Sequence, residues 1–445
     1  MIFGATGNLM YKKLIPALNQ LIKNHYIDET LKIFAIARTN QTTKDYFEQA
    51  KKEVKENIDW LVLEKYVEYL SFDVNTDNDY RQLEERMRSE NYQDISIYLA
   101  VPPQLFPVIS KGISKAALIE KGQSNRRIVF EKPFGEDLES AKEVNQTLWQ
   151  YFDENQIYRI DHYLGKEMIQ NILIVRFANI VFENIWDNRS IKSITILSKE
   201  TEGIMSRGGY YDQIGALKDM LQSHLLQMAA LVLMEKPVRK DSECIKDEKV
   251  KVLRKLNFDQ NSVFKGQYKG YKDLEKVKPN SQTETFIYVK AMIDDPKWEG
   301  VPIHFLTGKK LDEKRSEIII HFKDNQPLFP QSIKVENKLV IKVSPEEGVE
   351  FKFGIKQPGL TEAIQPAILN YCHNCMAIGN TPEAYEKLLL ELLNSQRTLF
   401  TRWDEIETTW DKIKGLNQKN QLFIYQDYHE IKNELNRLGV DHYDL

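Results

Sequence analysis

Apolar strand-like segments and amphipathic helical segments alternate regularly through the first 152 residues of the chain. Because parallel strands need long crossover connections, usually helices, this alternation predicts a Rossmann-like, doubly wound parallel sheet. We expect residues 1–160 to form this α/β domain. The predicted strands lie near residues 33–37, 68–72, 95–101 and 127–130. Of the four helices predicted between and after them, the first starts near residue 42 and the second covers 77–89. The third ends near residue 118, and the fourth covers 137–152.

The alternation begins with a glycine turn, Gly4-Ala5-Thr6-Gly7, between a short apolar segment and a helix. Glycines let the backbone approach a pyrophosphate, and the N–H groups at the start of the following helix favour the anion. Many strand-to-helix turns contain glycine, so the turn alone is a weak indication. Its position at the start of a doubly wound sheet favours a dinucleotide coenzyme.

Arg38 follows the second predicted strand, where NAD-binding proteins of this fold typically place an acid for the ribose hydroxyls. A guanidinium can bind a 2′-phosphate that a carboxylate would repel. Arg38 therefore favours NADP over NAD. The alternative is that Arg38 is an ordinary surface cation and that another residue selects the coenzyme.

The motif Glu131-Lys132-Pro133 ends the fifth predicted strand. Ligands of open α/β sheets bind outside the carboxyl ends of the strands, so Lys132 can reach the substrate or the coenzyme. The same motif occurs in another broad group of sugar dehydrogenases. It therefore does not define the substrate.

The densest group of polar side chains lies at residues 159–167, Arg-Ile-Asp-His-Tyr-Leu-Gly-Lys-Glu, where a short apolar strand passes into a helix. Such a group is typical of a cleft. If residues 164–166 open the helix, its N–H groups favour an anion, and His162 and Lys166 can add donors. The alternative is a solvated helix N-terminus. The motif predicts a phosphate site with an acid, Asp161, beside it.

After residue 160 the pattern changes. Strand-like segments are separated by less regular helical intervals, which predicts a larger α+β domain, residues 161–445, with a mostly antiparallel sheet. These segments lie near residues 191–197, 286–292, 317–322 and 338–343.

His224 lies in an apolar helical segment that begins near Leu217. A lone histidine in such a segment is more often a core residue than a base. On an ideal helix Asp219 lies about 140° away, so we expect the orienting carboxylate to come from elsewhere, with Asp161 as the candidate. A carboxylate on one imidazole nitrogen leaves the other nitrogen free to accept a proton.

Two further segments carry weaker indications. Residues 308–315 are cationic, and they are either a solvated turn or, with a phosphorylated substrate, a second anion-binding segment. Cys372 and Cys375 have the spacing of half a zinc site. No second Cys-x-x-Cys completes it, so we expect a structural or incidental pair and no metal.

The charge balance, Lys+Arg 61 against Asp+Glu 65, gives a net charge of −4 and indicates neither a nucleic-acid nor a membrane partner. No apolar run approaches the roughly 18 residues of a membrane helix. Three cysteines in 445 residues indicate a reducing compartment. We expect a cytoplasmic protein.

Taken together, these motifs resemble those of the glucose-6-phosphate dehydrogenase family, and the resemblance covers nearly the whole chain. The motifs are Gly4–Leu9, Glu131–Gly135, Arg159–Glu167, Gly208–Asp212, Asp219–His224, Trp298–Pro302, Gly308–Lys309, Pro382–Tyr385 and Phe400–Glu405.

The resemblance implies oxidation of glucose 6-phosphate to 6-phospho-D-glucono-1,5-lactone by hydride transfer from C1 to NADP, the first step of the oxidative pentose phosphate pathway. Use of NAD as a secondary coenzyme stays open. His224 would be the general base and Asp161 would orient it. The resemblance also implies a homodimer or homotetramer, assembled through the large sheet.

The other site residues follow from the same resemblance. His162, Tyr163 and Lys166 would hold the 6-phosphate. The sugar contacts would be Lys13, Lys132, Glu200, Asp219, Lys309 and Lys314. The coenzyme would contact Gly4, Ala5, Thr6, Gly7, Asn8, Leu9, Arg38 and Lys132.

Three features depart from the family pattern. The chain starts three residues before Gly4, whereas the family's first strand is longer, which predicts a weaker first strand. Asn8 replaces an aspartate, and we expect it still to cap the helix. Ser223 replaces an asparagine before His224, which puts a supporting hydrogen bond in doubt.

Two alternatives follow. A different sugar dehydrogenase with the Glu-Lys-Pro motif would leave Lys166, His162 and Lys309 without a phosphate to bind. A weakly active NADP-binding homologue is suggested by the short first strand and Asn8.

Overall fold

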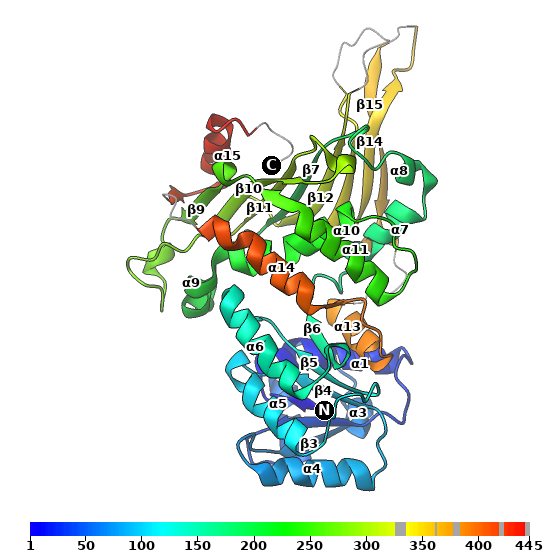
Figure 1. Ribbon diagram of the computed structural model, residues 1–445, viewed down its shortest axis with the longest axis vertical. Coiled ribbons are helices and arrows are strands. Elements are labelled where there is room, and N and C mark those ends of the chain that lie inside the picture. Colours follow the sequence, from blue (N-terminus) through cyan, green and yellow to red (C-terminus); the bar gives the residue numbers. More distant parts are fainter. Residues whose placement is uncertain (325–334, 361–362, 377–382, 418–421, 441–445) are drawn as a thin grey trace. The chain divides into compact units, whose positions relative to one another are not determined.

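The computed structural model describes residues 1–324, 335–360, 363–376, 383–417 and 422–440 (Figure 1). Pro382, part of one family motif, lies outside these residues. The chain divides into two compact units, each assembled from segments distant in sequence. The first unit contains Met1–Gly165, Arg239–Lys246 and Pro382–Glu407, and the second contains Lys166–Val238, Asp247–Thr381 and Thr408–Leu445.

The first unit is built on a seven-stranded sheet of order β16-β6-β5-β4-β1-β2-β3. Strands β1 to β6 are parallel, and β16 pairs antiparallel with β6. The strand order changes direction at β1, so the ends of β1 and β4 form the topological switch point of a doubly wound fold. The strands are β1 (Ile2–Phe3), β2 (Ile33–Ala37), β3 (Val67–Ser71), β4 (Ile95–Leu99), β5 (Arg126–Phe130), β6 (Ile157–Ile160) and β16 (Phe400–Thr401).

Helices connect these strands, as the alternation predicts. Thr42 and Asp137 cap two of them, each accepting the N–H of the third helical residue. The apolar faces pack onto a core that includes Phe3, Ile97 and Phe130. The helices are η1 (Met10–Leu14), α1 (Ile15–Lys23), α2 (Thr43–Glu53), α3 (Trp60–Tyr66), α4 (Asp77–Ser89), α5 (Phe106–Lys115), α6 (Leu138–Tyr151) and α13 (Ala384–Leu393).

The second unit is built on a ten-stranded sheet of order β15-β14-β13-β12-β7-β11-β10-β9-β17, with β8 beside β10. Only the β7–β11 and β9–β17 pairs are parallel, which confirms the predicted mostly antiparallel sheet. The strands are β7 (Ile191–Lys199), β8 (Leu256–Phe258), β9 (Phe264–Tyr268), β10 (Phe286–Ile293), β11 (Ile303–Gly308), β12 (Arg315–Phe322), β13 (Lys338–Ser344), β14 (Gly348–Lys356), β15 (Ile364–Cys372) and β17 (Phe423–Tyr425).

Helices pack against this sheet, with η5 on β7 and β11 and α7 on β13. No helix in the described part of the chain has the length and apolarity needed to cross a membrane. Helices α11 (Ser242–Lys255) and α14 (Trp403–Ile413) contribute residues to both units. The others are α7 (Glu167–Phe177), α8 (Ile180–Asn184), α9 (Gly208–Ala216), η5 (Leu217–Leu225), α10 (Leu226–Leu233), α12 (His373–Met376) and α15 (Tyr428–Arg437).

One disulfide joins Cys372, the last residue of β15, to Cys375, with 5.3 Å between their Cα atoms. Cys244 is a free thiol.

Candidate active site

The carboxyl edge of the first sheet collects the residues that the sequence assigns to a coenzyme. Gly4 follows β1, Arg38 follows β2 and Lys132 lies just beyond β5. A cavity of about 340 Å³ opens at this edge, lined by the glycine turn and by residues that follow β2, β3 and β4, among them Arg38 and Asn75. Its position is the one where open α/β sheets bind ligands.

Gly4 is required by the geometry of this turn. Its φ is +86°, and a Cβ added to it would lie 2.2 Å from the carbonyl oxygen of Ala100, beyond β4. The N–H groups of Gly4 and Ala5 donate to the carbonyl of Ile36 at 2.9 and 3.1 Å. The turn is therefore held between β2 and β4 with its backbone close to both, which leaves the cavity open to a ligand.

Arg38 is exposed, and its guanidinium makes no hydrogen bond or ion pair within the described residues. The pKa of Asp73 lies below its usual value, chiefly because the N–H of Asn75 donates to it and in a smaller part because of the Arg38 charge. The guanidinium is thus placed at the cavity without an ion-pair partner from the described chain.

Asn8 does not act as expected. It is exposed, and helix η1 has no side-chain cap among the residues described. The predicted cap is therefore wrong, because Asn8 and Leu9 are already helical, so Asn8 lies within the first turn and not before it.

Lys132 is half-buried, and its neighbour Glu131 is held by two phenols. The hydroxyls of Tyr98 and Tyr385 donate to Glu131 Oε1 at 2.5 and 3.2 Å. Burial raises the pKa of Glu131. Tyr385 belongs to a motif that carries the family resemblance, but the sequence assigned it no role.

The central motif contains one structural cation and one buried acid. Arg159 is buried, and its guanidinium donates to Glu154 at 2.6 and 2.9 Å and to Asn145 at 2.5 Å. Asp161, also buried, accepts the N–H of Tyr163 at 3.0 Å. Arg159 therefore supports the fold, whereas Asp161 shapes the turn that carries His162 and Tyr163.

The condition that residues 164–166 open the helix is met only by Lys166. Helix α7 begins at Glu167 with Lys166 as its N-cap, and the preceding residues form a turn in which the Leu164 N–H donates to the Asp161 carbonyl at 3.0 Å. At Gly165 a Cβ would lie 2.6 Å from the carbonyl oxygen of Ala384. Contact with the start of α13 thus explains this glycine and the break before the helix. His162 and Tyr163 are half-buried, with ring centroids 5.1 Å apart.

Lys13, a predicted sugar contact, lies in η1 and forms an exposed ion pair of 2.8 Å with Glu383. Exposed ion pairs contribute little free energy, so this pairing does not prevent Lys13 from reaching a ligand.

In the second unit, two predicted sugar contacts come together. Lys309 follows β11 and Glu200 follows β7, and the Lys309 ammonium lies 2.8 Å from the Glu200 carboxylate. Lys309 is buried, and its carbonyl accepts the hydroxyl of Tyr425 at 2.6 Å. A buried ammonium beside a half-buried carboxylate provides both a donor and an acceptor for sugar hydroxyls.

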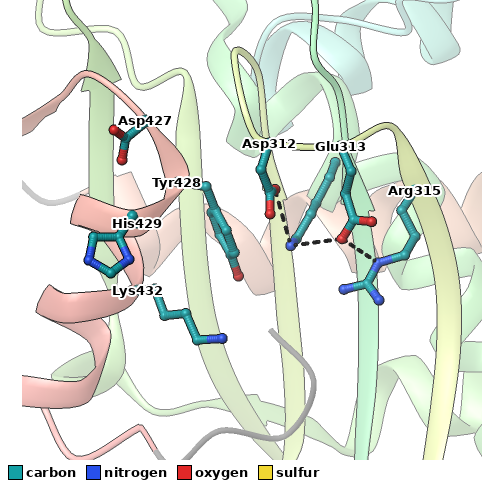
Figure 2. Close-up of a pocket in the computed structure, with 8 residues that line it drawn as sticks. Asp312, Glu313, Arg315, Asp427, Tyr428, His429 and Lys432 are labelled. Atoms are coloured by element: carbon teal, nitrogen blue, oxygen red, sulfur yellow. Dashed lines mark hydrogen bonds and ion pairs between the residues drawn. The ribbon is translucent and has the colours of Figure 1, made fainter.

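The cationic segment 308–315 is mostly engaged within the chain. A pocket of about 620 Å³ lies at this segment. Figure 2 shows its lining, with Asp312, Glu313 and Arg315 across from Tyr428, His429 and Lys432 of α15. The Lys199 ammonium lies 3.5 Å from each of the two carboxylates and 3.6 Å from the centre of the Tyr428 ring. Burial lowers the pKa of Lys199. The cations of this pocket are therefore partly neutralised by its own acids.

Lys314 is the exception in that segment. It is exposed and makes no hydrogen bond or ion pair within the part of the chain that is described. It is therefore available to a ligand, whereas Lys310, also exposed, has its ammonium 4.9 Å from the centre of the Tyr268 ring.

His224 and Asp219 lie in η5, which is π-helical. A π-helix bonds residue i to residue i+5, so residues five apart lie one turn apart on the same side. The 140° separation expected for an ideal helix is therefore wrong here. His224 is only 2% exposed, and the Ser223 hydroxyl donates to the Asp219 carbonyl at 3.0 Å. Asp161 and His224 belong to different units, and their pairing stays a prediction.

A cavity at the switch point of a Rossmann-like sheet, and a second, α+β unit that carries a buried histidine and a half-buried acid on one helix, define a nicotinamide-dependent dehydrogenase.

Comparison with known proteins gives the family. Residues 1–171 match the model of the glucose-6-phosphate dehydrogenase NAD binding domain, and residues 173–437 match that of the C-terminal domain. The chain therefore belongs to the glucose-6-phosphate dehydrogenase family.

Individual relatives agree with this assignment. The chain is 38% identical over 444 residues to glucose-6-phosphate 1-dehydrogenase of Bacillus subtilis, covering 94% of this chain and 90% of the relative. It is 40% identical over 441 residues to the protein of the same name from Borreliella burgdorferi, covering 94% and 91%. A solved structure of glucose-6-phosphate dehydrogenase in complex with glucose 6-phosphate superposes with a TM-score of 0.89 at 34% identity, covering 95% and 93%.

Proposed function

We propose that this chain oxidises D-glucose 6-phosphate to 6-phospho-D-glucono-1,5-lactone with NADP as hydride acceptor, the first step of the oxidative pentose phosphate pathway. The observation that carries the proposal is the likeness, over 95% of the chain, to a solved structure that holds glucose 6-phosphate. Residues 1–160 would bind the coenzyme, and residues 161–445 would bind the sugar and assemble the oligomer. The small number of cysteines favours the cytoplasm as its location, and the Cys372–Cys375 disulfide is the observation against it.

The chemistry needs a base and an orienting acid. His224 accepts the proton of the C1 hydroxyl, and the hydrogen on C1 departs as hydride, so that the C1–O bond becomes the lactone carbonyl. Asp161 orients the imidazole and stabilises its protonated form. A bound nicotinamide coenzyme supplies the hydride acceptor.

The residues at the first cavity fit such a coenzyme. Gly4 has no room for a Cβ against the Ala100 carbonyl, and Gly7 and Thr6 complete the turn that a pyrophosphate would approach. Ala5, Asn8, Leu9 and Lys132 would complete the contacts. The exposed Arg38 guanidinium would hold the 2′-phosphate of NADP, with NAD as a weaker substitute.

The substrate phosphate would be held by His162, Tyr163 and Lys166. The sugar would be held by charged side chains, some of which form ion pairs within the chain. Lys309 and Glu200 are paired with each other at 2.8 Å, Lys13 is paired with Glu383, and Lys314 has no ion-pair partner in the described chain. Asp219 and Lys132 would complete the sugar contacts.

The edge of the second sheet supports self-association. Strands β14 and β15 lie at one end of the order, and β15 exposes large apolar side chains on both faces, Leu369 and Tyr371 on one and Ile368 on the other. An exposed apolar edge strand is a template for pairing with another chain. We assign this sheet to the interface of a homodimer or homotetramer.

The decisive experiment measures initial rates with NADP and with NAD, each with glucose 6-phosphate and with glucose. Fast turnover restricted to NADP and the phosphorylated sugar is expected. Equal rates on both sugars would instead indicate a different sugar dehydrogenase, and tight NADP binding without turnover would indicate an inactive homologue. Comparable rates with NAD would preserve the activity and contradict the role of Arg38.

A further inference from the structure

Glu284 is a buried acid that faces the start of helix η5, the helix that carries Asp219 and His224. Its Oε1 accepts the N–H of Leu217 at 2.9 Å, and its carbonyl oxygen accepts the N–H of Ala216 at 3.0 Å. The first N–H groups of a helix have no partner within the helix. One residue, 67 positions away in sequence, thus satisfies two consecutive donors at this helix start.

The chain is broken to make this contact. Gly215 has φ +67° and ψ 175°, which interrupts the helical path between α9 and η5. A Cβ at Gly215 would lie 2.4 Å from Glu284 Oε1. A residue with a side chain would therefore meet both the strain of a positive φ and a collision with the carboxylate. The missing side chain at Gly215 therefore leaves the room that the Glu284 carboxylate occupies.

The segment before Glu284 is fixed to the helix on the other side of the break. Asp212 of α9 accepts the hydroxyl of Tyr271 at 3.1 Å, the N–H of Lys278 at 3.2 Å and the hydroxyl of Ser281. The Thr283 hydroxyl donates to the Asp212 carbonyl at 2.6 Å. Glu284 is consequently presented by a segment that cannot slide along the helix without breaking these bonds.

Two cations face Glu284 from neighbouring elements, Lys265 of β9 and Lys218 of η5. Burial raises the pKa of Glu284, and these two charges and the Leu217 N–H act in the opposite direction. The negative form of the carboxylate is also favoured by the positive end of the helix dipole.

We propose that Glu284 is a positioning residue for the reaction: by holding the N-terminus of η5 against the sheet, it fixes where Asp219 and His224 present their side chains. This inference rests on the proposed function, because it assigns Glu284 to the helix that carries the base. Asp219 lies in the first turn after the capped amides, and His224 lies one π-helical turn beyond it.

The test compares Glu284→Ala and Glu284→Gln with a matched control, Glu317→Ala. Glu317, in β12, is another buried acid of the second unit, with a pKa that burial also raises. Glu284→Ala should lower kcat about 10- to 100-fold, because small displacements of reacting groups are costly. Glu284→Gln keeps an acceptor oxygen and should stay within about 3-fold of wild type. Glu317→Ala should leave kcat unchanged, and all three should leave the KM for NADP unchanged.

A readout independent of turnover is hydrogen exchange at the amides of residues 216–219. Glu284→Ala should accelerate it, whereas Glu284→Gln and Glu317→Ala should not. A double-mutant cycle with Gly215→Ala sharpens the result. In the Glu284→Ala background the added methyl no longer meets a carboxylate, so the two losses in kcat should combine to less than their product.

The outcomes separate the two proposals. A wild-type protein without turnover of glucose 6-phosphate would overturn the proposed function, and the exchange data would still test the cap. An active wild type whose Glu284→Ala variant is folded, with wild-type kcat and exchange, would overturn the role of Glu284. Equal impairment by Glu284→Ala and Glu284→Gln would overturn the hydrogen bond as its cause.

Discussion

The molecule contains two helix starts that both follow a glycine of positive φ. They differ in whether the chain itself supplies an acceptor for the free N–H groups of the helix. At the first, Gly4 has φ +86° and its added Cβ would collide with the Ala100 carbonyl; at the second, Gly215 has φ +67° and its Cβ would collide with Glu284. The first turn opens on a cavity, and helix η1 has no side-chain cap among the described residues. The second is capped by a carboxylate of the chain itself.

This difference teaches that a glycine of positive φ before a helix does not by itself indicate a ligand site. The deciding feature is the source of the negative charge at the helix start. Where the fold supplies its own carboxylate, the helix is fixed and can carry chemistry. Where it supplies none, the N–H groups remain for an external anion.

The largest expected effect tests the chemistry on the capped helix. His224→Asn should lower kcat by about 10² to 10⁴, because a general base contributes that much, with little change in the KM for either substrate. Initial rates on a variant with wild-type thermal stability measure this. A kcat near wild type would show that His224 is a core histidine.

The next effect tests the open helix start. Gly4→Ala should weaken NADP binding by at least about 2 kcal/mol, roughly 30-fold, through backbone strain and the collision with Ala100. Calorimetric titration of NADP measures it. Gly122→Ala is the matched control, because Gly122 also has a positive φ, +84°, but nothing lies within 4 Å of its added Cβ. Equal NADP affinity in both variants would contradict the close approach at Gly4.

A smaller effect concerns the preference of the cavity beside Gly4 for NADP over NAD. Arg38→Ala should raise the KM for NADP about 10-fold and spare NAD, because the variant loses hydrogen bonds between charged groups. The KM values for both coenzymes measure it, with the exposed Arg88 replaced by Ala as control. Equal losses with NAD and NADP would assign Arg38 to another part of the coenzyme.

The effect that is smallest per step of the experiment is a pH dependence of stability that arises in the second sheet, where a histidine is buried. Burial, helped by the charges of Lys290 and His321, lowers the pKa of His304 to about 4. Between pH 6.5 and 4, His304 therefore binds a proton in the unfolded chain but not in the folded chain. Stability consequently falls as the pH falls. The free energy of unfolding should decrease by about 1 kcal/mol per pH unit in this window on account of His304.

Urea titrations at several pH values measure this slope. His304→Gln should flatten it, whereas the same replacement at the half-buried His162 of the first unit should not. An unchanged slope in His304→Gln would assign the acid sensitivity to other groups.

Much of the first sheet could be predicted from the sequence because its segments have clear periods. Helix α4 has the predicted bounds, Asp77–Ser89, and β2 and β6 lie where apolar residues cluster. Helix α3 was missed because it passes directly into β3, with no turn residue between Tyr66 and Val67.

The geometry of helix η5 could not be predicted. The apolar spacing of residues 217–231 fits an ordinary helix, and nothing in it indicates the π-helical segment that brings Asp219 and His224 to one side. Glu284 was missed for a related reason. Its partner Leu217 is far away in sequence, and a buried carboxylate before a strand has no local pattern.

The first unit is assembled from segments at both ends of the chain, and this has a consequence for its folding during synthesis. Residues 382–407 supply β16, which pairs with β6, and α13 with its following turn, which provides the Leu392 carbonyl and the Ser395 hydroxyl to the buried guanidinium of Arg127. During synthesis, the amino-terminal portion emerges long before these partners exist. The dinucleotide-binding half must therefore wait on the ribosome for nearly the whole polypeptide before its sheet edge is closed. Arg127, already paired with Asp94 at 2.7 Å, gains its remaining two acceptors only then. A nascent chain released before residue 382 would keep β6 as an open edge, ready to pair with a neighbouring molecule.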